Sequence, residues 1–127
     1  MQIERIDHIV LKVKSIATTC AFYQKHLGME VADLVNGRKA LKFGQQKINL
    51  FETGNAPKLL EANVKEWNTN ICFITTTPIE IVKAQLEKNN IQIIQGIVPK
   101  VGALGTIQSI YFQDPDNNLI EVANYES

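Results

Sequence analysis

Several features of membrane, secreted and nucleic-acid-binding proteins are missing from this 127-residue sequence. It has no apolar run near the roughly 18 residues that a membrane-spanning helix needs. Basic and acidic residues number 13 each, so the formal net charge is zero. A protein that binds the phosphate backbone of nucleic acids usually carries a basic excess. The sequence therefore predicts a chain that binds neither a membrane nor a nucleic acid.

The first residues lack the apolar segment of a secretory signal peptide. There are only two cysteines, Cys20 and Cys72, and both lie within apolar stretches. This usage suits a reducing compartment in which both thiols are free and buried. We therefore expect a cytoplasmic protein, with a disulfide between the two as the weaker alternative.

The first half of the chain alternates between strand and helix patterns. Four segments have strand character and one, Ser15–Leu27, has apolar residues at helical spacing. Ser15 is suited to cap that helix, and Gly28 is suited to end it. Asn36-Gly37 predicts a tight hairpin turn, and residues 44–46 predict another. The predicted strands are Ile6–Val13, Met29–Val35, Lys39–Phe43 and Lys47–Phe51.

The second half repeats this order after a connector of about residues 54–67, in which Lys58–Val64 is suited to a short helical turn. Thr77-Pro78-Ile79-Glu80 predicts a capping box with proline at the first helical position. The helix then ends at Asn89-Asn90. The predicted strands are Thr69–Thr75, Ile91–Val98, Thr106–Phe112 and Leu119–Asn124.

This duplicated order predicts a single α+β domain of two βαβββ modules. The first module covers about residues 3–53, and the second covers about residues 68–125. Each sheet then buries one face under its helix. The other faces remain free, and paired sheets of this kind curve around a cleft.

Four polar residues occupy equivalent strand positions in the two halves. His8 and Asn70 are 62 residues apart, and each precedes an apolar triplet. Asn49 and Glu121 are 72 residues apart, and each lies between two apolar residues. Because strand side chains alternate between faces, all four point away from the helices. A carboxylate is costly in a core unless it is paired, so this placement explains Glu121.

Three segments resemble the vicinal oxygen chelate superfamily, which includes glyoxalase I, bleomycin-resistance proteins, fosfomycin-resistance enzymes and extradiol dioxygenases. They are Asp7-His8-Ile9-Val10-Leu11, Phe22-Tyr23-x-x-x-Leu27-Gly28-Met29 and the segment from Tyr111 to Glu121, which contains Asp114-Pro115-Asp116. The resemblance covers nearly the whole chain and is greatest to small glyoxalase-domain-containing and virulence-type members. It implies two βαβββ modules around a metal-centred cleft, and a homodimer.

The resemblance also implies site residues. His8 and Glu121 match metal ligands of the superfamily. Asn70 stands where many members have histidine, and Asn49 stands where glyoxalase I has glutamate. Imidazole and carboxylate suit Zn, Ni, Mn or Fe(II), with Asn49 and Asn70 as further, weaker ligands. With these two departures, glutathione-dependent glyoxalase I activity is not expected.

Two functions remain open at this point. One is a lyase, isomerase or dioxygenase in which a metal at His8 and Glu121 chelates a small oxygenated molecule. The other is a binding protein that sequesters a small molecule, with His8 and Glu121 hydrogen-bonded in a metal-free cleft. Glu121 is also a candidate general base, with Tyr111 as its partner.

Other candidates surround these residues. Ser109 and Tyr111 share the parity of the cleft face, although Tyr111 is equally suited to be an ordinary strand tyrosine. Residues 98–105 predict either a lid over the cleft or a plain long connection. Asp114–Asn118 is predicted as a hairpin turn, because it lacks the spacing of a calcium loop. The basic candidates for binding an anionic substrate, or for simple solvation, are Lys12, Arg38, Lys42 and Lys100.

Overall fold

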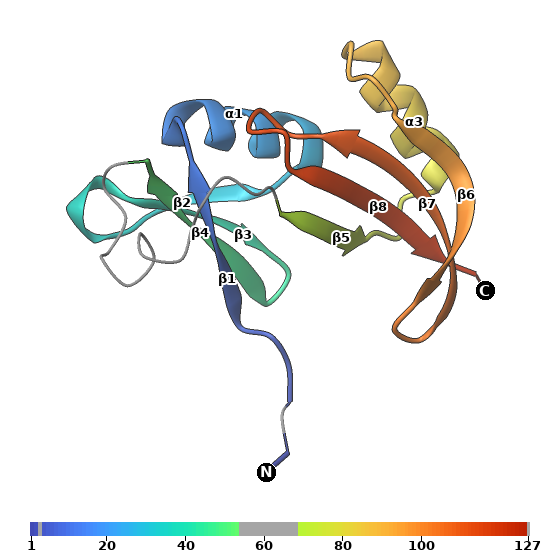
Figure 1. Cartoon of the computed structure of the whole chain (residues 1–127), viewed down its shortest axis with the longest axis horizontal. Coiled ribbons are helices and arrows are strands. Elements are labelled where there is room, and N and C mark those ends of the chain that lie inside the picture. The colour runs from blue at the N-terminus through green and yellow to red at the C-terminus, as the bar shows by residue number, and fades with distance from the viewer. Residues whose placement is uncertain (3, 54–68, 127) are drawn as a thin grey trace. The chain divides into compact units, whose positions relative to one another are not determined.

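The computed structural model describes residues 1–2, 4–53 and 69–126 (Figure 1). The chain divides into two compact units, Met1–Trp67 and Asn68–Ser127. In its described residues, each unit contains one four-stranded sheet and one helix of ten or more residues. No helix in the described residues is long and apolar enough to cross a membrane.

The first unit has the predicted βαβββ order. Its sheet has the strand order β1-β4-β3-β2, in which β1 pairs with β4 in parallel and the other pairs are antiparallel. Helix α1 packs against this sheet. The elements are β1 (His8–Val13), α1 (Ile16–Leu27), β2 (Glu30–Asp33), the 3-10 turn η1 (Val35–Gly37), β3 (Lys39–Phe43) and β4 (Gln46–Glu52).

The second unit has the same topology. Its sheet has the order β5-β8-β7-β6, with a parallel β5–β8 pair and antiparallel neighbours. Helix α3 contacts β7 and β8. The predicted α+β fold of two βαβββ modules is therefore confirmed. The elements are β5 (Asn70–Ile74), α3 (Ile79–Lys88), β6 (Gln95–Gly102), β7 (Gly105–Gln113) and β8 (Leu119–Tyr125).

The strand registers support the duplication. Val10 lies opposite Asn49 in the parallel pair of the first sheet. Cys72 lies opposite Glu121 in the parallel pair of the second. The first strands are thus related by 62 positions and the last strands by 72, as the sequence offsets predicted.

Strand alternation places the apolar residues under the helices. In the first module Ile48 and Leu50 of β4 are buried with Tyr23 of α1. In the second module Ile120 and Val122 of β8 are buried, as are Ile79 and Leu86 of α3. Cys20 is buried as expected, but the prediction of a buried Cys72 was wrong. Cys72 has the opposite parity to Ile71 and Phe73 and is exposed on the other face.

Helix α1 is capped as predicted. The Ser15 hydroxyl accepts a hydrogen bond from Thr18 N–H at 3.2 Å. Gly28 follows the helix in the left-handed conformation, with φ of 67°. A strand residue adds a cap that the sequence pattern did not predict. The Glu52 carboxylate, at the end of β4, accepts a hydrogen bond from Ile16 N–H at 3.0 Å.

The capping box predicted for the second helix was wrong. The helix begins one residue later, with Pro78 in the N-cap position and no side-chain cap bond. The Asn124 side chain of β8 accepts from Ile79 N–H at 2.7 Å instead. Its amide donates to the carbonyls of Thr75 and Thr77 at 2.7 and 2.9 Å. Asn124 and Glu52 are 72 positions apart, so the same strand position caps the helix in both modules.

Two turn predictions also need correction. Asn36-Gly37 does not form a two-residue hairpin. It belongs to η1, and Leu34 N–H donates to the Arg38 carbonyl at 2.8 Å to close a longer turn. Residues 98–105 form neither a lid loop nor a long connection. Strand β6 continues to Gly102, and a short turn at Ala103-Leu104 leads into β7. Pro99 is tolerated because β6 is an edge strand and pairs only with β7.

The predicted turn at Asp114–Asn118 is confirmed. One Asp114 carboxylate oxygen accepts from the backbone N–H groups of Asp116 and Asn118, each at 2.9 Å. Asn118 in turn accepts from Thr69 N–H at 2.8 Å and so ties the turn to the start of β5. The predicted helical turn at Lys58–Val64 lies outside the described residues.

Replacing the strand cap of the second module is expected to destabilise the protein. Asn124→Ala removes three hydrogen bonds, two of them partly buried, and leaves Ile79 N–H without its partner. We expect the free energy of unfolding to fall by about 2–3 kcal/mol in urea denaturation. Asn89→Ala is the control, because Asn89 makes an exposed bond to Gln85. A loss below about 0.5 kcal/mol in Asn124→Ala, equal to the control, would contradict this role.

Candidate functional site

The four polar positions lie on the helix-free faces of their sheets, as strand parity predicted. Asn49 alternates with buried Ile48 and Leu50, and Glu121 alternates with buried Ile120 and Val122. His8 and Asn70 are exposed at the starts of β1 and β5. The parity is thus confirmed within each module, and the meeting of all four in one site remains a prediction.

The second module has a concavity of about 450 Å³ on its helix-free face. Strands β5, β8 and β7 contribute its floor, and the β6–β7 hairpin contributes a wall. The predicted residues Lys100, Tyr111 and Glu121 line it. The remaining lining residues are Cys72, Ile74, Val101, Gly102, Ala103, Ile107 and Tyr125.

Glu121 is the carboxylate of this concavity. Cys72 of β5 and Tyr111 of β7 lie opposite it on either side in the strand registers. The hydroxyl of Ser109, a fully buried residue, donates to Glu121 Oε2 at 2.7 Å. This hydrogen bond fixes one carboxylate oxygen. The carboxylate also interacts with the side chains of Cys72 and Tyr111, which flank it.

The two neighbours of Glu121 are held in their protonated forms. Although Cys72 is exposed as a residue, partial burial of its thiol, then the Glu121 charge, raises the pKa of Cys72 to about 11. Burial of the phenol, then its interaction with the Glu121 carboxylate, raises the pKa of Tyr111 to about 12. Both groups are therefore neutral hydrogen-bond donors near pH 7. Tyr111 is therefore suited to donate a hydrogen bond, because its raised pKa makes it a weaker acid than a free tyrosine.

Lys100 and Tyr125 organise the wall. The Lys100 ammonium lies 5.6 Å from the centroid of the Tyr111 ring. The Tyr125 hydroxyl accepts a hydrogen bond from Leu104 N–H at 3.0 Å, which fixes the hairpin turn. A Cβ on Gly102 would come within 2.9 Å of that hydroxyl, so glycine is needed at this close approach. Ser109 lies beneath the concavity as a support for Glu121 and not as a lining residue.

The other basic candidates lie on the first module. Lys12 and Lys42 occupy the helix-free face, where they pair in register with Phe51 and Lys47. The Arg38 guanidinium lies 4.6 Å from the centroid of the Phe51 ring. These residues are not among those that line the concavity of the second module.

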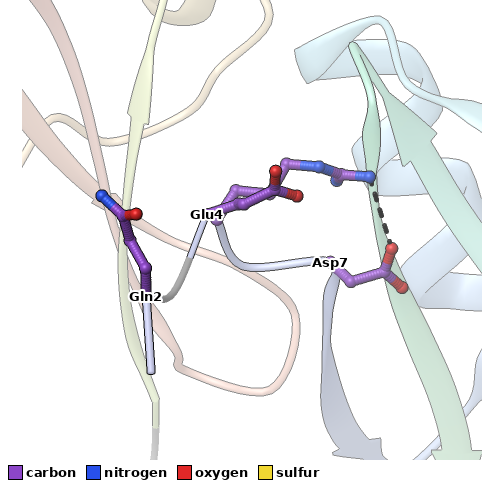
Figure 2. A pocket seen from close by; sticks show the side chains of 4 residues that line it. Gln2, Glu4 and Asp7 are labelled. Carbon is purple, nitrogen blue, oxygen red and sulfur yellow. Dashed lines mark ion pairs between the residues drawn. The ribbon is translucent and has the colours of Figure 1, made fainter.

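His8 is oriented by its neighbour in sequence. Its Nδ1 lies 2.8 Å from Asp7 Oδ2, which leaves Nε2 as the ring nitrogen for a metal. This hydrogen bond, followed by the charge of Arg5, lowers the pKa of Asp7. Figure 2 shows Asp7 with Gln2, Glu4 and Arg5 around an open hollow, and the dashed line marks the 3.6 Å ion pair between Arg5 and Asp7. The side chains that line this hollow are all exposed. One of them, Asp7, orients His8.

The chemistry of the donors fits a divalent metal in part. Asn49 Oδ1 is buried and has no hydrogen-bond partner among the described residues, which suits an oxygen that awaits a ligand. His8 offers Nε2 and Glu121 offers its carboxylate. However, residues 1–2, 4–53 and 69–126 contain no cluster of three or more His, Cys, Asp or Glu side chains arranged for a metal. A metal here would need amide, water or substrate oxygens to complete its coordination.

Cys72 and Tyr125 are the polar lining residues that the sequence analysis did not single out. Parity carries the signal for both. Cys72 is two residues after Asn70, and Tyr125 is four after Glu121, so each shares a face with a predicted site residue. Both were missed because neither matches a ligand position of the superfamily.

The raised pKa of Cys72 predicts slow alkylation. In metal-free protein at pH 8, iodoacetamide should modify Cys72 about 10- to 100-fold more slowly than the same cysteine in urea. Glu121→Gln should accelerate the folded-state reaction about threefold, because burial remains the larger cause. Mass spectrometry distinguishes alkylation of Cys72 from alkylation of Cys20.

Glu126→Gln is the control and should leave the rate unchanged, since Glu126 bonds to Gln108 instead. The raised pKa of Cys72 also makes the stability of the protein depend on pH. The unfolded thiol ionises near pH 9 and the folded thiol near 11, so the free energy of unfolding falls as the pH rises through that window. Fast alkylation of the folded protein at pH 8, equal to that in urea, would contradict the placement of Cys72 beside Glu121.

Comparison with known proteins gives consistent results. The virulence protein STM3117 of Salmonella typhimurium is 43% identical over 125 residues, which are 98% of this chain and 87% of that protein. The metallothiol transferase FosB of Staphylococcus epidermidis is 30% identical over 94% of this chain and 83% of its own length. A solved structure from the mobile metagenome of V. Pseudocholerae superposes with a TM-score of 0.94 and 42% identity, covering 100% of this chain and 98% of that one.

A family model also matches residues 5–122, which include the first strand and Glu121. The matched region covers nearly all of both βαβββ modules and all three motifs on which the resemblance rested. On the strength of this match and of the fold, the chain belongs to the Glyoxalase/Bleomycin resistance protein/Dioxygenase superfamily.

Proposed function

We propose that this protein binds a small oxygenated molecule on the helix-free face of its second module, next to Glu121. The observation that carries the proposal is the Glu121 carboxylate in a concavity of about 450 Å³, with Oε2 held by Ser109 and the Cys72 and Tyr111 side chains beside it. Carboxylates placed in this way are suited to hold a metal or to accept a substrate proton.

The proposed chemistry is that of a divalent-metal-dependent lyase, isomerase or dioxygenase. His8 and Glu121 would be the main ligands, and Asn49 and Asn70 the weaker ones. Zn, Ni, Mn and Fe(II) all accept such a donor set. When bound, the metal would polarise two neighbouring oxygens of the substrate. Tyr111 would orient the substrate or donate a proton, since its phenol stays protonated.

Two local features of the proposed ligands support this proposal. Asp7 holds Nδ1 of His8 and exposes Nε2, which is the arrangement found around metal-bound histidines. Asn49 Oδ1 is buried without a described partner. The related FosB of Staphylococcus epidermidis is named a metallothiol transferase, which supports the metal-dependent candidate.

The second candidate is a non-catalytic binding protein of the bleomycin-resistance type. Asn49 and Asn70 favour it, because neutral amides are weak replacements for glutamate and histidine ligands. In that case the same concavity would sequester the molecule without a metal. Both candidates are compatible with a homodimer, and the free thiols of Cys20 and Cys72 support a cytoplasmic location.

Metal analysis distinguishes the two candidates. We expect tag-free wild-type protein to hold about one Mn, Ni, Zn or Fe(II) ion per chain after titration and dialysis, measured by plasma mass spectrometry. His8→Ala and Glu121→Ala should each weaken binding at least about tenfold, because each removes one of two good ligands.

His26→Ala is the matched control, since the only other histidine packs against Phe22 on α1. It should bind metal as the wild type does. A wild type that holds none of the four metals would reject the metal-dependent enzyme and leave the binding protein. No turnover of the methylglyoxal–glutathione adduct is expected in either case.

A further inference from the structure

The position of Lys100 gives information about the ligand that the proposed site takes. Lys100 lies in β6 opposite Ile107, and its ammonium is 5.6 Å from the centroid of the Tyr111 ring. Tyr111 is itself opposite Glu121. The cation therefore extends from the wall over the residue beside the carboxylate. Although the Lys100 side chain is exposed, the attraction between its ammonium and the Tyr111 ring favours this position.

Among the residues that the structure describes, no acidic side chain forms an ion pair with the Lys100 ammonium. The ion pairs in residues 1–2, 4–53 and 69–126 involve Arg5, His8, Lys39 and Lys83, and none involves Lys100. Glu121 accepts from Ser109 and does not pair with Lys100. The concavity thus has one positive and one negative group, each with capacity for a ligand.

The wall that carries Lys100 is held in place. Tyr125 Oη accepts from Leu104 N–H at 3.0 Å, and Gly102 allows the hydroxyl to approach. Lys100 is only two residues before Gly102 on the same strand. The hairpin therefore presents the ammonium from a fixed backbone, which reduces the entropy lost when a ligand binds.

The concavity also has an apolar part. Ile74 is 51% exposed and Ile107 is buried, and both line the concavity. An aliphatic group packed on them would gain the free energy of burial. A phosphate dianion is a poorer match, because only one cation is present and sites for phosphate usually add several N–H donors.

From this arrangement we propose that the ligand is a small organic acid with a hydroxyl group next to the carboxylate and a short aliphatic chain. The carboxylate binds the Lys100 ammonium, the hydroxyl donates to the Glu121 carboxylate, and the chain packs on Ile74 and Ile107. The inference rests on the proposed function and adds the class of molecule. It assigns Lys100 as the residue that selects an acid over its uncharged analogue.

The test compares an acid with its amide. Titrations of 2-hydroxyisocaproate and of 2-hydroxyisocaproamide are followed by the backbone amide NMR signals of the whole protein. We expect the acid to bind at least about tenfold more tightly than the amide, because the amide cannot make the charge-assisted contact. The shifts should be centred on β6, β7 and β8.

Variants assign the effect to Lys100. Lys100→Met should bring the acid to the affinity of the amide, and Lys100→Arg should stay within about threefold of wild type because the charge remains. Lys88→Met removes an exposed lysine from the last turn of α3 and should change neither affinity. If Lys100→Met does not fold, its NMR spectrum will show this. The role of the positive charge is then judged from the acid and amide affinities of Lys100→Arg.

Equal affinities of acid and amide in the wild type, or an acid affinity unchanged in Lys100→Met, would overturn the inference. So would the absence of shifts at β6–β8 with either compound. These failures are distinct from failure of the proposed function, which is judged by metal bound at His8 and Glu121. A protein that holds the metal but does not prefer the acid would keep the proposed function and lose this inference.

Discussion

A β-strand can turn only every second side chain toward a helix, and this constraint organises both modules. Ile120 and Val122 are buried under α3, so Glu121 must point to the other face of the sheet. The same rule places Cys72 and Tyr111 on that face beside it. Because the helix side provides the core, the opposite side is free to carry a carboxylate, a thiol and a phenol. Ser109, buried but polar, then fixes the carboxylate with one hydrogen bond.

The two modules share their structural hydrogen bonds but not their polar surfaces. Glu52 and Asn124 occupy equivalent positions in β4 and β8, and each caps the first N–H of its helix. Three residues earlier, the equivalent pair is Asn49 and Glu121, which differ in charge. The face of the first module carries Lys12, Lys42 and Lys47, whereas the corresponding face of the second contains the concavity with Glu121. The two modules thus share the helix cap, whereas their helix-free faces carry different polar residues.

Much of the fold could be predicted from the sequence because local patterns determine it. Alternation in β4 and β8, the Ser15 cap and Gly28 all depend on neighbouring residues. The capping of α3 could not be predicted, since Asn124 is 45 residues from Ile79 and only the sheet brings them together. The β6–β7 hairpin was missed for a related reason. Gly102, Gly105 and Pro99 suggest a loop, but pairing with β7 and an edge position allow a strand. In the site, parity identified Glu121 and Tyr111, whereas the position of the Lys100 ammonium over Tyr111 required the structure.

The central claim is that Glu121 is the carboxylate of a ligand site and not an incidental charge on a sheet. The most direct measurement is a crystal structure of tag-free protein grown with Mn²⁺, with anomalous data collected to locate the metal. The account predicts an anomalous peak within about 2.3 Å of a Glu121 carboxylate oxygen and of His8 Nε2. A structure with Mn²⁺ bound elsewhere, or with no peak at Glu121 at saturating metal, would contradict it.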